Sequence, residues 1–170
     1  MTTPLDQFRA EKDAFYREHP QSPLDRPERE TFRGLRYYPE NPALVFDLEP
    51  ELLDPQELVE MQTSTGDKAV YLRWARVSFQ VEGQGATLTV YRDPGSGALF
   101  LPFQDANAGG ETYGSGRYLE VEEAADGGLH LDFNYAYNPY CAYSDGWSCP
   151  MPLPENRLHV PIRAGEQNYH

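Results

Sequence analysis

The chain has 170 residues, a length typical of a single domain, and a formal net charge of −13 at pH 7. This acidity argues against nucleic acids and anionic membrane surfaces as partners, because both require a basic footprint on the protein. No apolar run approaches the roughly 20 residues of a membrane span, and residues 1–4 lack the pattern of a signal peptide, so we expect a cytoplasmic protein.

The N-terminal segment has the pattern of a helix over residues 4–18. Thr3 can cap the first turn, and Pro4 suits the first helical position. The side chains that recur at helical spacing along one face are Leu5, Phe8, Lys12 and Phe15. Prolines end this pattern, and residues 19–33 are typical of an extended connection.

From Gly34 onward the hydrophobic period changes to two, which is typical of β-strands. Turns rich in Gly and Pro separate short runs that predict strands over residues 35–38, 44–48, 69–74, 76–82, 87–92, 98–102, 117–123, 128–135 and 157–163. No long helices alternate with these runs, so we expect antiparallel pairing. The sequence therefore predicts one domain over residues 1–170. It is mainly β, an antiparallel β-barrel-like or sandwich fold over residues 34–163 with an N-terminal α-helix.

One hairpin can be aligned from the pattern of its side chains. A loop over residues 126–128 places Val121 opposite Phe133 and keeps the apolar side chains on one face. The opposite face is strongly polar, and it either meets solvent or borders a hydrophilic cavity. It carries Tyr118, Glu120, Glu122, His130, Asp132 and Asn134.

A long segment, residues 136–156, joins two predicted strands and is rich in Tyr, Pro and Cys. Long loops in compact domains are usually functional or packed as compact loops. The rings of this segment either seal one end of the β domain or line a pocket for a ligand. The aromatic side chains of that pocket would be Tyr135, Tyr137, Tyr140, Tyr143 and Trp147.

Cys141 and Cys149 are the only cysteines of the chain, and three states are open to them. They could be buried thiols, form a disulfide, or supply two ligands to a metal ion. A metal is disfavoured because the spacing does not match a standard zinc site and no further cysteine exists. We expect the two α-carbons to lie within about 7 Å, the outer limit for a disulfide.

Charged groups near this segment could support binding or catalysis. Arg117 begins a flanking strand and is expected to pair with Asp132 or Glu155, because a buried carboxylate requires a partner. His130 and His159 lie on polar strand faces, where each is either solvated or a general base. The sequence contains no nucleophile elbow, phosphate-binding loop, dinucleotide fingerprint or zinc-protease motif, so the catalytic residues are unknown and we expect no cofactor.

Several longer motifs resemble those of a bacterial family known as domain of unknown function 1684. They are Phe32-Arg33-Gly34-Leu35-Arg36-Tyr37-Tyr38-Pro39, Phe103-Gln104-Asp105, Glu111-Thr112-Tyr113, Gly116-Arg117-Tyr118-Leu119, Leu131-Asp132-Phe133-Asn134, Ala136-Tyr137-Asn138-Pro139, Trp147-Ser148-Cys149-Pro150 and Glu155-Asn156-Arg157-Leu158. This resemblance covers nearly the whole chain and implies a single compact domain. It implies no activity and assigns no role to any residue.

The residues favour a protein that binds a small molecule in an aromatic pocket at one end of the β domain. The residues expected to contact the ligand are Arg117, Tyr118, Asp132, Asn134, Tyr137, Asn138, Tyr143, Trp147 and Glu155. A second hypothesis is a hydrolase or lyase in which Asp132 or Glu155 acts as general base and Arg117 as electrostatic stabiliser. A third is a structural or protein-interaction module, and the oligomeric state is open.

Overall fold

The structure of the protein is a computed structural model that describes residues 2–169. Its N-terminal helix is α1 (Pro4–Glu18), with the bounds predicted from the sequence. Thr3 and Asp6 form a reciprocal capping box, in which each side chain accepts a hydrogen bond from the other residue's backbone N–H. The following connection is not wholly extended as predicted, because Asp25 caps a short helix, α2 (Arg26–Thr31).

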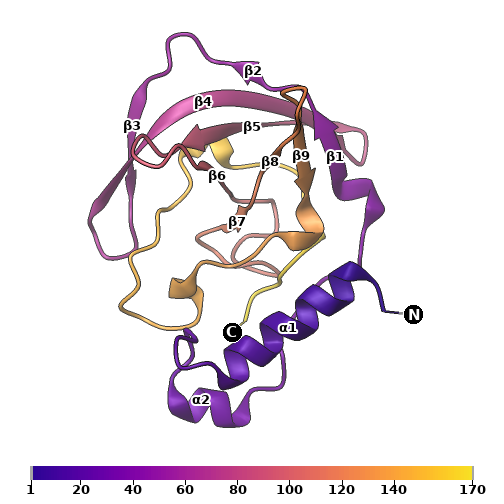
Figure 1. Cartoon of the computed structure of the whole chain (residues 1–170), viewed down its shortest axis with the longest axis vertical. Helices are drawn as coiled ribbons and strands as arrows, with labels where there is room; N and C mark the ends of the chain where they lie inside the picture. The colour runs from indigo at the N-terminus through magenta and orange to yellow at the C-terminus, as the bar shows by residue number, and fades with distance from the viewer. Residues whose placement is uncertain (1, 170) are drawn as a thin grey trace.

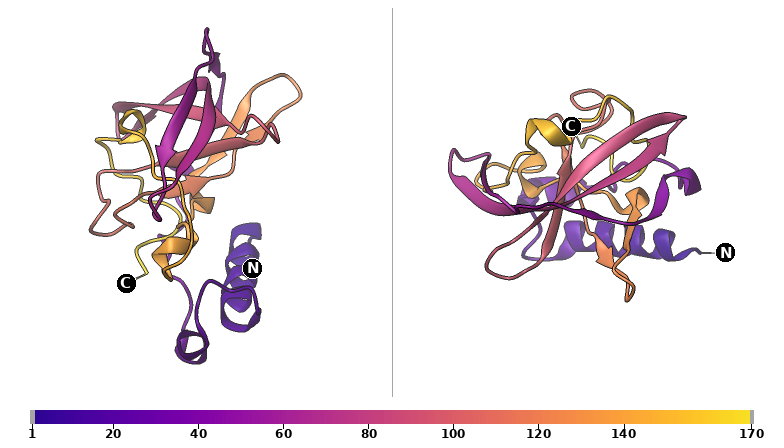
Figure 2. Two further views of the ribbon diagram at one scale, coloured as in Figure 1. Left: turned by 90° about the vertical axis from the view of Figure 1, so that its left-hand side faces the viewer. Right: turned by 90° about the horizontal axis from the view of Figure 1, so that it is seen from above.

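The strands form two antiparallel sheets (Figures 1 and 2). The larger sheet has the order β2 (Glu51–Leu52), β4 (Lys68–Val81), β5 (Gln84–Arg92), β6 (Leu99–Phe103) and β7 (Arg117–Leu119), with β3 (Leu58–Gln62) also paired to β4. The smaller sheet has the order β1 (Val45–Leu48), β9 (Leu129–Asp132) and β8 (Glu122–Glu123). The prediction of a mainly antiparallel β fold with an N-terminal helix is confirmed, and the sheets do not close into a barrel.

Both sheets contribute to one hydrophobic core, which includes Leu88 of β5, Leu101 of β6 and Leu131 of β9. A second, smaller cluster joins α1 to the rest of the domain and is built mainly of aromatic side chains. Its buried members are Tyr16, Leu24, Phe32, Leu35, Ala142 and Tyr143. Figure 1 shows the result: α1 and α2 lie at one end of the molecule, opposite the end where β2 pairs with β4.

Several predicted strands differ from those observed. The runs 69–74 and 76–82 are one strand, β4, whose register shifts between Arg73 and Ala75. Residues 35–38 form only an isolated bridge between Tyr37 and Glu166, and residues 157–163 form no named strand. The strands β2 and β3 were not predicted, because residues 51–62 are polar and lack a clear apolar alternation.

The predicted hairpin register is wrong by two residues. Glu122 lies opposite His130 and Glu123 opposite Leu129, so the turn lies one residue earlier in the chain than expected. A backbone hydrogen bond from Ala124 N–H to the Gly128 carbonyl closes it. A shift of two residues leaves every side chain on its predicted face, because successive side chains of a strand alternate between faces.

Candidate functional site

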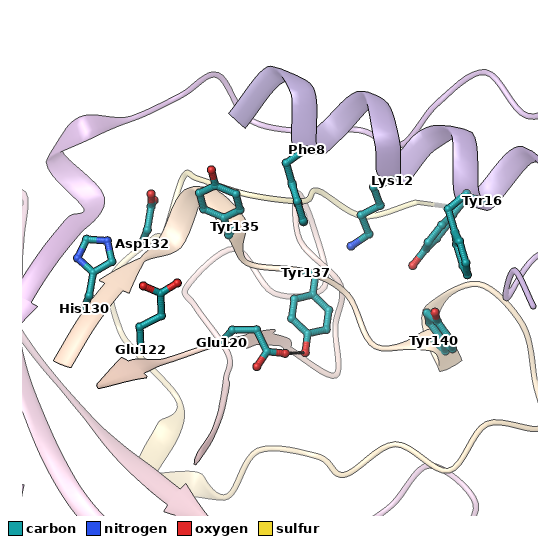
Figure 3. A pocket seen from close by; sticks show the side chains of 11 residues that line it. Phe8, Lys12, Tyr16, Glu120, Glu122, His130, Asp132, Tyr135, Tyr137 and Tyr140 are labelled. Atoms are coloured by element: carbon teal, nitrogen blue, oxygen red, sulfur yellow. Dashed lines mark hydrogen bonds between the residues drawn. The ribbon is translucent and has the colours of Figure 1, made fainter. Parts of the chain in front are cut away.

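A groove of about 680 Å³ lies between α1 and the polar face of the β8–β9 hairpin (Figure 3). Its residues come from three parts of the chain: α1, the segment from residue 120 to 122, and the segment from 130 to 140. They are Phe8, Lys12, Phe15, Tyr16, Glu120, Glu122, His130, Asp132, Tyr135, Tyr137 and Tyr140. The polar face predicted from the hairpin pattern therefore borders a cavity at four of its six positions.

Aromatic rings form two walls of this groove. The ring of Phe8 contacts Tyr135 edge to face, with 5.0 Å between ring centroids, and Tyr16 contacts Tyr140 at 6.3 Å. Phe8 is 39% exposed although it lies on the face of α1 that points toward the sheet. The helix thus leaves apolar ring surface open to the groove.

Carboxylates also border the groove, on the strand side opposite α1 (Figure 3). Glu120 accepts a hydrogen bond from the Tyr137 hydroxyl at 2.7 Å, while Glu122 lies opposite His130 in the hairpin. Asp132 accepts hydrogen bonds from the backbone N–H and the side-chain amide of Asn134, at 3.0 and 2.9 Å. These contacts hold Glu120 and Asp132 in place at the border of the groove.

His130 also borders the groove, and it has a carboxylate partner outside it. Its Nδ1 lies 2.8 Å from Asp47 Oδ1, a contact across the β1–β9 pair. The hydrogen bond to Asp47 raises the pKa of the His130 imidazole above its usual value. Both side chains are well exposed, so solvent screens this pair.

Lys12 lies between two aromatic rings and pairs with a buried carboxylate. Its Nζ lies 5.0 Å from the centroid of the Tyr137 ring and 5.6 Å from that of Tyr16. Its ion-pair partner is Glu166, which also accepts hydrogen bonds from the Tyr143 hydroxyl at 2.5 Å and from the Asn138 backbone N–H at 3.1 Å. The lysine is therefore neutralised inside the protein and connects α1 to the C-terminal segment.

Burial is the main cause of the raised pKa of Tyr137 and of Tyr143. The second cause at Tyr137 is its hydrogen bond to Glu120, and at Tyr143 it is the charge of Glu166. Both phenols consequently remain protonated and act as hydrogen-bond donors to these carboxylates.

Arg117 does not border the groove and does not pair with Asp132 or Glu155, so that prediction is wrong. Its guanidinium is 1% exposed and donates to the backbone carbonyls of Ile162, Ala164 and Glu166 at 2.6–3.0 Å. The nearest carboxylate is Asp105, at 3.7 Å. Arg117 therefore anchors the C-terminal segment to the sheet.

The other predicted ligand contacts are divided between the groove and the interior. Asp132 and Tyr137 border the groove, together with Tyr135 and Tyr140. Asn134, Asn138 and Tyr143 are buried. Tyr118 donates a hydrogen bond to the Pro150 carbonyl, and Glu155 binds Arg73 and Tyr91 on the larger sheet. Trp147 is 40% exposed and packs on Tyr140, and His159 is exposed.

The contribution of α1 to the groove was not predicted from the sequence. Its contributions are Phe8, Lys12, Phe15 and Tyr16. One signal was present: Lys12 interrupts an otherwise apolar stripe of the predicted helix. A lysine in that position requires a partner or an opening to solvent, because a buried charge is costly.

Cys141 lies close enough to Cys149 to affect its pKa, and both cysteines are free in the structure. Cys141 also lies 3.7 Å from the Tyr113 hydroxyl, and the backbone N–H of Cys149 donates to Ser64 Oγ. Burial raises the pKa of Cys149 to about 11. Residues 2–169 contain no cluster of three or more His, Cys, Asp or Glu side chains arranged to hold a metal ion.

We expect Cys149 to react with iodoacetamide at pH 8 at least about tenfold more slowly than Cys141, because only the thiolate is a nucleophile and Cys149 is the more buried thiol. Timed alkylation of reduced native protein, followed by mass spectrometry of the two cysteine peptides, measures the two rates. Equal rates would contradict the greater burial of the Cys149 thiol.

The elements and the groove define a small antiparallel β domain whose N-terminal helix lies across the polar face of the β8–β9 hairpin. A sequence model described as "Protein of unknown function (DUF1684)" matches residues 30–167, so the chain belongs to the DUF1684 family. An uncharacterised protein of Haloarcula marismortui, with a solution NMR structure, is 39% identical. The TM-score is 0.72, and the alignment covers 96% of this chain and 91% of that one.

No curated protein matches the chain. The family match begins after α1, so it contains the strand side of the groove but not the helix side. No helix within residues 2–169 is long and apolar enough to cross a membrane.

Proposed function

We propose that the protein binds a small organic molecule in the groove between α1 and the β8–β9 hairpin. The observation that supports this proposal is the groove itself, whose volume of about 680 Å³ lies within the range typical of ligand sites. Such sites combine apolar walls with a few well-placed polar groups. Here the walls are rings of Phe8 and Tyr135, and the polar groups are carboxylates on the strand side.

The groove is not required to complete the core of the domain. The main core is closed by residues of both sheets, none of which borders the groove. The helix is attached separately, through buried Leu5 and Tyr16 and through the Lys12–Glu166 ion pair. Phe8 is not part of these attachments and remains 39% exposed. A bound molecule would remove that apolar surface from water.

A carboxylate hydrolase or lyase built on Arg117 has no support in the geometry. Arg117 is buried among backbone carbonyls, and Glu155 lies with Arg73 on the larger sheet.

For the location of the protein we propose the cytoplasm, because its adjacent free thiols are compatible with a reducing compartment.

Two-dimensional amide NMR of the labelled protein with a library of small aromatic amines, alcohols and acids tests the proposal. We expect some of these compounds to shift amides of α1 and of residues 120–140. Phe8→Ala should weaken their binding about tenfold, because a contacted phenylalanine ring supplies on the order of 1.5–3 kcal/mol when fully covered.

Tyr71→Ala is the matched control, since Tyr71 packs on Phe100 of the larger sheet and does not border the groove. It should leave the affinities unchanged. If no compound in the library shifts groove amides, or if the shifts lie on another surface, the proposed function is wrong.

A further inference from the structure

We propose that the ligand of the groove is an organic cation, an ammonium group carried on an apolar body. This inference rests on the proposed function and specifies its ligand class. Two features of the groove support it: an excess of carboxylates that no lysine or arginine at the border neutralises, and aromatic rings placed beside them.

The charges at the groove border are unequal. Glu120, Glu122 and Asp132 supply three carboxylates, and among the residues that the structure describes Lys12 is the only lysine or arginine at the border. The charge of Lys12 is already balanced by Glu166, which is buried behind it. A protonated His130 would be shared by Asp47, Glu122 and Asp132, so the carboxylates still outnumber the cations. The border therefore retains a negative field for a ligand to neutralise.

The tyrosines of the groove experience this field. Burial is the first cause of the raised pKa of Tyr135, and the charges of Asp132 and Glu40 come next. Arg9 opposes them, and Glu122 adds a smaller effect in the same direction as the other carboxylates. Negative charge that disfavours a phenolate favours a cation at the same place. A ligand with a carboxylate or phosphate would meet repulsion there.

The groove also shows how it accommodates an ammonium group. Lys12 Nζ is held over the rings of Tyr137 and Tyr16 and against one carboxylate. Rings attract cations through their negative faces, and this attraction grows as water is excluded. The other half of the groove repeats that combination, with the rings of Phe8 and Tyr135 close to Glu122 and Asp132, but has no lysine or arginine of its own (Figure 3).

Calorimetric titration with three probes that share a benzyl group tests the inference: benzyltrimethylammonium, benzyl alcohol and phenylacetate. We expect benzyltrimethylammonium to bind at least about tenfold more tightly than benzyl alcohol, and phenylacetate to bind most weakly. Amide shifts of α1 and of residues 120–140 must accompany the titration. The variant Glu120→Gln/Glu122→Gln should weaken the cation about tenfold and leave benzyl alcohol unchanged, because it removes charge and keeps side-chain size.

The matched control is Glu49→Gln/Glu51→Gln, which removes two exposed carboxylates outside the groove and the same net charge. It should leave cation binding within about twofold, since exposed charges at a distance are screened by salt. Equal binding of all three probes in the groove, or tighter binding of phenylacetate, would overturn the inference and leave the proposed function standing. Binding of none of them at groove amides would count against both.

Discussion

Replacing Arg117 with methionine is expected to destabilise the fold by about 3–5 kcal/mol, the range for removing one partner of a buried charge pair. The guanidinium is 1% exposed, and its nitrogens donate to the carbonyls of Ile162, Ala164 and Glu166. A methionine fills part of the volume but donates no hydrogen bond. Three buried carbonyls would lose their donor, and each unsatisfied buried group has a desolvation cost of about 1–3 kcal/mol.

Asp105 adds to the expected loss. Its carboxylate lies 3.7 Å from the Arg117 guanidinium and is itself buried. It would keep its hydrogen bonds from the Thr112 hydroxyl and the Ile162 backbone N–H, at 2.7 Å each, but would lose the neighbouring positive charge. The C-terminal segment is therefore expected to loosen from the larger sheet first.

Urea unfolding followed by circular dichroism measures this loss, with Arg163→Met as the matched control. Arg163 is exposed and reaches only Glu82, at 3.3 Å, so its replacement should change stability by less than about 1 kcal/mol. Equal midpoints for the two variants would contradict the anchoring role of Arg117.

Local signals made part of this fold predictable. The bounds of α1 follow from a capping threonine, a proline at the first helical position and prolines after its end, all within one stretch of chain. The polar face of the hairpin followed from alternation alone. It survives the error in register because a two-residue shift preserves the parity of every side chain.

The rest depends on contacts between distant segments, which carry no local pattern. The partners of Arg117 are mainly backbone carbonyls, and a carbonyl has no signature in the sequence. The docking of α1 across the hairpin brings Phe8 to Tyr135, more than a hundred residues away. For the same reason the predicted pocket included Trp147, which lies outside the groove, and omitted the helix that forms one of its walls.

The connection between α1 and the C-terminal segment leads to a second large expected effect. Glu166→Gln should destabilise the protein by about 2–3 kcal/mol. This is less than the roughly 3–5 kcal/mol of a fully buried pair, because the Lys12 side chain is 15% exposed and water can partly solvate it. The glutamine carbonyl can still accept from Tyr143 and from the Asn138 N–H, so the main loss is the unpaired charge of Lys12.

Adding Lys12→Met to Glu166→Gln should recover at least about 1 kcal/mol, since residues in contact typically show coupling energies of 0.5–3 kcal/mol. The recovery is expected because the double variant contains no uncompensated charge at this position. Lys12→Met alone should also be destabilising, because it leaves the Glu166 carboxylate buried with only two donors. Urea unfolding of the wild type, the two single variants and the double variant gives the coupling energy between Lys12 and Glu166 directly. If the loss of stability in the double variant equals the sum of the two single losses, the ion-pair argument is refuted.

The same four proteins separate stability of the whole domain from attachment of the helix. Lys12 and Glu166 join α1 to a segment that Arg117 holds on the larger sheet, so breaking the pair should release the helix before the sheets unfold. Amide hydrogen exchange in Glu166→Gln should therefore accelerate in α1 far more than in β5, whose Leu88 and Val90 are fully buried in the core. Phe8, Lys12 and Tyr16 form one wall of the groove, so helix release should also abolish the probe binding expected there. Uniform acceleration across α1 and β5 would mean that the ion pair stabilises the domain as a whole and does not specifically hold the groove together.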